Sequence, residues 1–125
     1  MRIWRFMDYC SEAGNDLIEE WYLRQPAAVQ ADFDVTLKNL SIAEDWRGLT
    51  SFKPLRDGLF EIRFTTANVQ YRPAGVYGPG ARTFTILIGC KKKMKTYDPP
   101  NAFVTAQKRR RLLDQGRATL RERIV

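Results

Sequence analysis

The sequence predicts an α+β fold, in which an N-terminal strand and a helical hairpin pack on a small antiparallel sheet, followed by a C-terminal helix. Two observations support this class. Apolar residues recur at helical spacing between residues 12 and 44, whereas between residues 59 and 90 they alternate with polar ones. Helices and strands that are grouped along the chain are typical of α+β proteins, where helices cover a face of the sheet.

The first half of the chain is expected to form one strand and two helices. Residues Ile3–Met7 alternate as in a short strand, and Ser11 is a suitable N-cap for a helix over residues 12–24. Pro26 then ends this helix or begins the next, which runs to about Glu44. The apolar stripe of this second helix consists of Val29, Phe33, Leu37 and Leu40.

The strands of the sheet are expected between residues 52 and 90. A short extended piece, Phe52–Leu55, precedes a turn, and Leu59–Thr65 then alternates between apolar and polar residues. Val69–Val76 and Arg82–Cys90 are two further strands, which the Gly- and Pro-containing loop 77–81 joins as a hairpin.

A final helix is expected with Asp98 as N-cap and Pro99 at its first position, running to about Arg123 with or without an interruption at Gly116. Helices on one face of the sheet would leave the other face solvated.

Alternation places Glu61 and Arg63 on that open face of the sheet. Gln70 and Arg72 join them if their neighbours, including Tyr71, point to the core.

Charge is strongly segregated along the chain. Residues 1–52 carry five Lys/Arg against nine Asp/Glu, whereas residues 53–125 carry sixteen against five, so the two parts have net charges of −4 and +11. The basic part contains a lysine-rich segment over residues 91–97 and the run Lys108–Arg111, which is expected to lie mostly outward. Segregation of this size indicates a polyanionic partner, and the alternative is a solvated charged face without a partner.

Length and composition limit the remaining possibilities. We expect one domain, 1–125, because a chain of 125 residues can bury a core without disulfides. No apolar run approaches the length that spans a bilayer, and the N-terminal residues lack the apolar stretch of a signal peptide. Cys10 and Cys90 form no CxxC pair, although one buried disulfide between them stays open. A cytoplasmic protein with reduced thiols and no membrane partner is expected.

The chain contains no histidine. Its absence excludes Ser-His-Asp and Cys-His catalysis and disfavours most zinc and iron sites. We expect no metal and no cofactor, and any general acid or base must be a carboxylate, Lys, Tyr or Cys.

Several short segments follow one another along the second half of the chain, namely Asp57–Arg63, Tyr71-Arg72, Lys92-Lys93, Thr96 and Pro99. Their order and spacing resemble the RelE/ParE toxin superfamily, in particular its phage-derived Gp49-like, HigB-type branch. The resemblance implies the RelE-like, microbial-RNase-like fold and a toxin with a cognate antitoxin as partner. RelE- and HigB-type members cut mRNA on the ribosome, whereas ParE-type members inhibit DNA gyrase.

The resemblance also implies roles for individual residues. Arg63, Arg72, Lys91 and Tyr97 match RelE-like catalytic positions. Glu61 departs from the pattern, because RelE-like toxins have a lysine there. The expected RNA-binding residues are Lys92, Lys93, Lys95, Lys108, Arg109 and Arg110.

Cleavage of RNA by its own 2′-hydroxyl needs a base, an acid and cations that stabilise the phosphate. Arg63 and Arg72 are expected to clamp the phosphate, because a guanidinium can hold two phosphate oxygens. Tyr97 is expected to act as base if nearby lysines, such as Lys93, lower its pKa, and Glu61 is a competing base. The alternatives are a non-enzymatic binding protein of the same fold and a general nucleic-acid binder.

Overall fold

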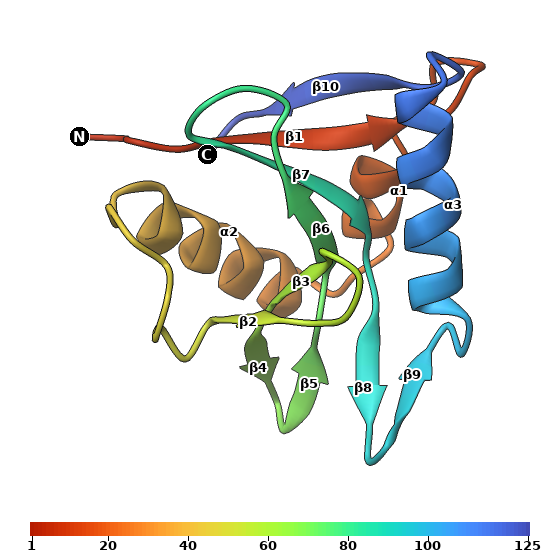
Figure 1. The fold of residues 1–125 in the computed structure, drawn as a ribbon. Coiled ribbons are helices and arrows are strands. Elements are labelled where there is room, and N and C mark those ends of the chain that lie inside the picture. The colour runs from red at the N-terminus through yellow and green to blue at the C-terminus, as the bar shows by residue number, and fades with distance from the viewer.

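A computed structural model describes the whole chain, Met1–Val125, and contains three helices and two sheets (Figure 1). The strand order in the larger sheet is β10-β1-β7-β6-β3-β2 and in the smaller sheet β4-β5-β8-β9. This α+β architecture agrees with the predicted class. The helices are α1 (Leu17–Leu23), α2 (Ala27–Ser41) and α3 (Ala102–Asp114).

The first strand, β1 (Arg5–Cys10), lies inside the larger sheet. It pairs in parallel with β7 (Thr83–Ile88) and antiparallel with β10 (Thr119–Arg123). The N-terminal strand was therefore predicted in the right region, but it begins and ends later than expected.

The first helix begins later than the sequence predicts. The Asp16 side chain accepts hydrogen bonds from the backbone N–H groups of Ile18 and Glu19, and so Asp16 rather than Ser11 is the N-cap. Ser11 instead belongs to a tight turn, in which Gly14 adopts a φ of 88°. This left-handed conformation is incompatible with a helix over residues 12–16.

Two of the predicted strands are each divided between the two sheets. Leu59–Thr65 becomes β3 (Phe60–Ile62) and β4 (Phe64–Thr66), and the chain passes from one sheet to the other at Arg63. Val69–Val76 likewise becomes β5 (Val69–Tyr71) and β6 (Ala74–Tyr77). The second break falls at Arg72-Pro73, where the proline has no N–H to continue a ladder. The short extended piece predicted at Phe52–Leu55 is the strand β2 (Phe52–Pro54), which pairs antiparallel with β3.

The lysine-rich segment over residues 91–97 forms most of a β-hairpin. Strands β8 (Lys91–Lys93) and β9 (Thr96–Asp98) pair antiparallel and extend the smaller sheet beyond β5. Asp98 therefore belongs to a strand, and Asn101 is the residue that precedes α3. The prediction of Asp98 as N-cap was wrong.

The helix predicted to reach Arg123 ends at Asp114. Gly116 has a φ of 70° and terminates the helix, after which the chain returns along β1 as β10. The Arg123 guanidinium donates two hydrogen bonds of 2.9 Å to the buried Asp8 carboxylate, which fixes the new strand in register.

The helices cover both faces of the larger sheet. Phe6 and Phe84 pack against Trp46, which follows α2, whereas Tyr9 faces Arg109 of α3. Every residue of β7 is buried as a result, and Figure 1 shows α2 and α3 on opposite sides of this strand. The expectation of one solvated face was wrong for the central strands. No helix of the structure has the length and apolar character needed to cross a membrane.

Candidate functional site

The junction between the two sheets gathers a cluster of charged and phenolic side chains. Glu61 comes from β3, Arg63 and Arg72 from the two crossings between the sheets, and Tyr97 from β9. The carboxylate of Glu61 lies 3.1 Å from the Tyr97 hydroxyl, 3.6 Å from Arg63 Nε and 4.0 Å from Arg72 Nε. The structure thus brings together three of the four residues that match catalytic positions.

Glu61 is buried rather than solvated. Its side chain is only 5% exposed, although alternation places it on the open face. The β8–β9 hairpin carries Tyr97 over this part of β3, and the phenol donates a hydrogen bond to Glu61 Oε2. The alternation of residues along a strand cannot predict that a distant segment of the chain buries one of them.

Arg72 is buried and its donors are mostly committed to the protein. Its Nη1 donates to the carbonyl oxygens of Tyr71 and Phe64 at 2.8 and 3.4 Å, and its Nη2 donates to Gln70 Oε1 at 2.9 Å. Its Nε is buried without a hydrogen-bond partner. Burial and the neighbouring charge of Arg63 lower the pKa of Arg72. These hydrogen bonds join Arg72 to β4 and β5, and its buried positive charge lies 4.0 Å from the Glu61 carboxylate.

Arg63 is the accessible guanidinium of the cluster. Its side chain is 34% exposed, compared with 6% for Arg72. Of the two arginines expected to clamp a phosphate, Arg63 is the one that solvent reaches.

Tyr97 is a protonated phenol. Burial, followed by the negative charge of Glu61 and the hydrogen bond to it, raises the pKa of Tyr97 to about 12. The expected lowering of this pKa by nearby lysines was wrong, because Lys93 and Lys95 point into solvent at the hairpin. The Tyr97 ring packs on Phe103 of α3 with centroids 4.4 Å apart, and Lys92 Nζ lies 5.6 Å from the ring centroid.

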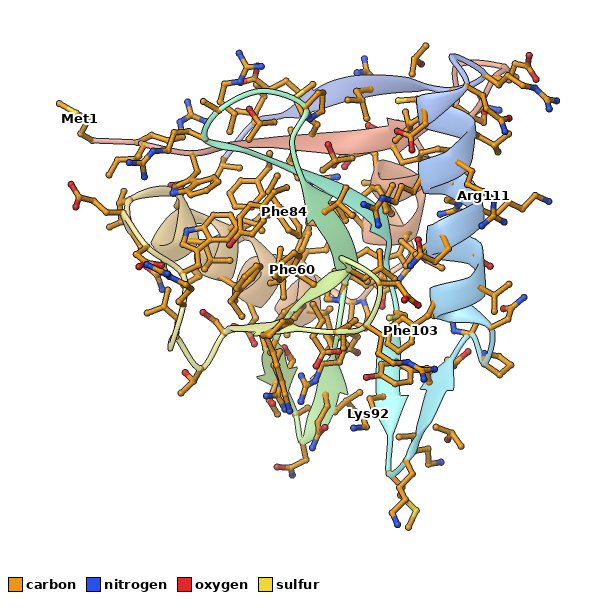
Figure 2. All side chains as sticks on the ribbon, in the orientation of Figure 1. Met1, Phe60, Phe84, Lys92, Phe103 and Arg111 are labelled. Carbon is orange, nitrogen blue, oxygen red and sulfur yellow. The ribbon has the colours of Figure 1, made fainter.

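Among the lysines of the β8–β9 hairpin, Lys92 lies over the Tyr97 ring, whereas Lys91, Lys93 and Lys95 are exposed. Lys91 Nζ lies 4.0 Å from Asp98 Oδ2 on the exposed edge of the hairpin. Figure 2 shows Lys92 on β8, in the lower part of the molecule, where the chain leaves the larger sheet. The fourth predicted catalytic residue, Lys91, therefore belongs to a basic rim and not to the Glu61 cluster.

The basic run of α3 is divided between surface and interior. Lys108 is exposed, but Arg109 points to the sheet, where its Nη1 donates to the Leu87 carbonyl at 2.8 Å. Burial lowers the pKa of Arg109. Arg110 Nη1 donates to the Asp57 carbonyl at 2.7 Å. The expectation of an outward run was wrong for Arg109, because position 109 lies on the helix face that covers β1.

A family model described as phage derived protein Gp49-like (DUF891) matches residues 20–111. The chain belongs to this Gp49-like family. The family is a RelE-like, toxin-like branch, and the matched region contains Glu61, Arg63, Arg72 and Tyr97. Searches of curated proteins and of solved structures found no significant match.

Three residues of the candidate site were not predicted from the sequence to be site residues. Gln70 accepts from Arg72, and Phe103 supports the Tyr97 ring. Cys90 Sγ lies 2.9 Å from the Arg72 carbonyl, and burial raises the pKa of this thiol to about 12. Only Gln70 carried a signal, since alternation placed it beside Arg72. Both cysteines are free thiols, and no cluster of three or more His, Cys, Asp or Glu is arranged to hold a metal ion.

Proposed function

We propose that this Gp49-like protein is the toxin of a type II toxin–antitoxin pair and cleaves mRNA on the ribosome. The observation that carries the proposal is the Tyr97 hydroxyl bonded to the buried Glu61 carboxylate, beside the accessible Arg63 guanidinium. A phenol, a carboxylate and a cation in contact can move a proton and stabilise a phosphate at one place.

The direction of the hydrogen bond suggests a relay. Tyr97 takes the proton of the ribose 2′-hydroxyl while it passes its own proton to Glu61 Oε2. The 2′-oxygen bonds to phosphorus and the bond from phosphorus to the 5′-oxygen breaks, which leaves a 2′,3′-cyclic phosphate. This route needs no phenolate, in agreement with a Tyr97 pKa of about 12.

The cations have separate roles in this scheme. Arg63 contacts the phosphate as its charge grows, and the lysines of the β8–β9 hairpin attract the RNA backbone. Arg72 is a positioning residue, because its guanidinium is buried and places a positive charge 4.0 Å from Glu61.

The geometry of the cluster supports the proposed dependence on the ribosome. An in-line displacement places the attacking and leaving oxygens on opposite sides of phosphorus. Glu61 and Tyr97 are 3.1 Å apart and so serve one side only. The proton for the 5′-oxygen must then come from water or from a group of the ribosome, which also orders the mRNA.

A second candidate is a non-enzymatic toxin of the same fold, such as a gyrase inhibitor. It is favoured by Glu61 itself, whose carboxylate occupies the space between the two arginines where a phosphate would otherwise bind.

Primer extension on mRNA in a reconstituted translation reaction, with and without ribosomes, distinguishes the nuclease from the non-enzymatic toxin. We expect discrete cuts only with ribosomes, weakened about 10²–10³-fold by Arg63→Ala. The matched control, Arg24→Ala, changes an exposed arginine outside the site and is expected to cut normally. No cuts from folded wild-type protein would favour the binding candidate.

A further inference from the structure

A groove of about 790 Å³ runs between α3 and the turn that joins β2 to β3. One wall consists of Pro54 and Leu55, and the other of Phe103 and Val104 on α3. Val104 is 69% exposed, although it is a large apolar residue on a helix that otherwise buries its sheet-facing side. An apolar strip that lines a groove is a feature of surfaces that bind another molecule.

Two arginines flank this apolar strip. Arg56 lies in the turn and Arg111 lies on α3, and both line the groove. The ion pairs of the molecule involve other residues, so neither guanidinium is neutralised by a carboxylate of its own chain. Figure 2 shows Arg111 pointing away from the fold. Asp57 also lines the groove, so the groove offers an apolar centre with a rim in which two arginines outnumber one carboxylate.

The walls of the groove are held at a fixed separation. Arg110 Nη1 donates to the Asp57 carbonyl at 2.7 Å, which ties α3 to the tip of the turn. A groove that exists before binding lowers the entropic cost of association.

The groove is also continuous with the candidate site. Phe103, on its α3 wall, packs against Tyr97 with ring centroids 4.4 Å apart, and Tyr97 bonds to Glu61. An occupant that contacts Phe103 therefore restrains the Tyr97 ring.

We propose that this groove binds an acidic amphipathic helix of a partner protein. Apolar side chains of the helix fill the space beside Leu55 and Val104, and its Asp or Glu residues pair with Arg56 and Arg111. An extended segment fits less well, because β2 is the edge strand and Pro54 has no N–H for a further ladder. The expectation that an occupied groove slows RNA cleavage rests on the proposed function, whereas binding of the helix does not.

The test selects peptides of about four helical turns from a helix-forming library against the folded full-length chain. We expect apolar residues on one face of the selected peptides and Asp or Glu beside it. Fluorescence anisotropy should then show that Val104→Asp weakens binding by about tenfold or more, because a carboxylate enters an apolar contact. Val35→Asp on α2 is the matched control, since Val35 is also exposed, at 55%, and we expect no change.

Charge reversal gives a second arm. Arg111→Glu should weaken the acidic peptides and strengthen the same peptides with Lys in place of Glu. Selected peptides without acidic residues, or equal binding to wild type and Val104→Asp, would overturn the proposal. The proposal would also be overturned if these variants lost binding to single-stranded RNA but kept binding to the peptides. Because anisotropy requires neither ribosomes nor cleavage, a protein that binds the peptides but never cuts RNA contradicts only the proposed function.

Discussion

A buried carboxylate is stable only while its neighbours compensate for the loss of water. At Glu61 the compensation comes from one hydrogen bond with Tyr97 and from two guanidinium groups at 3.6 and 4.0 Å. Burial and the charge of Glu61 in turn raise the pKa of the Tyr97 phenol, so the chemistry of the site depends on a few contacts that single substitutions can remove.

The titration of Tyr97 tests this environment. Its pKa is raised to about 12, so the hydrogen bond to Glu61 stabilises the fold below pH 10 and is lost as the pH rises through about 12. Absorbance at 295 nm follows the ionisation of the tyrosines. The part of this titration that is present in wild type and absent in Tyr97→Phe should have its midpoint near pH 12. A component that titrates at or below pH 10 would mean that the phenol is not held by Glu61.

Removal of Arg72 should cost more stability than removal of Arg63. Arg72→Met leaves Glu61 buried beside a single, partly exposed cation, and we expect a loss of about 3–5 kcal/mol in the free energy of unfolding. Arg63→Met removes an accessible charge and should cost about 1 kcal/mol or less. Urea denaturation measures both, and equal losses would contradict the assigned positioning role.

At the scale of helices and strands, a contact between residues far apart in the sequence holds the last strand in the sheet. The strand β10 follows a left-handed Gly116 and is joined to β1 by Arg123, whose Nη2 also donates to Glu19 of α1 at 2.9 Å. One guanidinium therefore connects the last strand, the first strand and the first helix.

Arg123→Met should loosen this connection. Burial raises the pKa of Asp8 to about 7 even with Arg123 present, so the carboxylate depends on its partner. We expect a loss of about 3–5 kcal/mol and faster amide exchange in β10. Arg121→Met changes an exposed arginine on the same strand and should stay within about 0.5 kcal/mol. Unchanged exchange in β10 would show that the strand is held by its ladder alone.

The same elements explain what sequence reasoning could and could not predict. Periodicity identified α2, β2 and the β6–β7 hairpin, because local spacing determines which face each residue presents. It missed β10, since Asp8 is the partner of Arg123 across 115 positions. Periodicity also missed the β8–β9 hairpin, because its consecutive charged residues do not alternate with apolar ones.

The candidate site was predicted in part for a related reason. Motif order brought Arg63, Arg72 and Tyr97 together, as the structure does. The burial of Glu61 and the inward position of Arg109 could not be predicted, because both depend on segments that pack across the sheet.

At the scale of the whole molecule, net charge determines how the protein meets a polyanion. The chain carries +7 overall, and the excess lies in residues 53–125. The exposed lysines of the β8–β9 hairpin project this charge beside the candidate site, whereas α2 belongs to the acidic half of the chain.

Salt dependence of ribosome or RNA binding tests this arrangement. Each lysine that contacts a phosphate contributes about 1 to the slope of log affinity against log salt. The double variant Lys93→Glu/Lys95→Glu should therefore lower the slope by about 2, and Lys38→Glu on α2 should leave it unchanged. A similar decrease for both variants would indicate attraction by net charge without a defined contact.

The most direct test of the account is the single-turnover rate of mRNA cleavage on ribosomes by Tyr97→Phe, with the ends of the product analysed. We expect a rate about 10²–10⁴-fold below wild type, 2′,3′-cyclic phosphate ends in wild type, and normal activity for Tyr77→Phe, which alters an exposed tyrosine outside the cluster. A folded Tyr97→Phe protein that cleaves as fast as wild type would contradict the proposed relay.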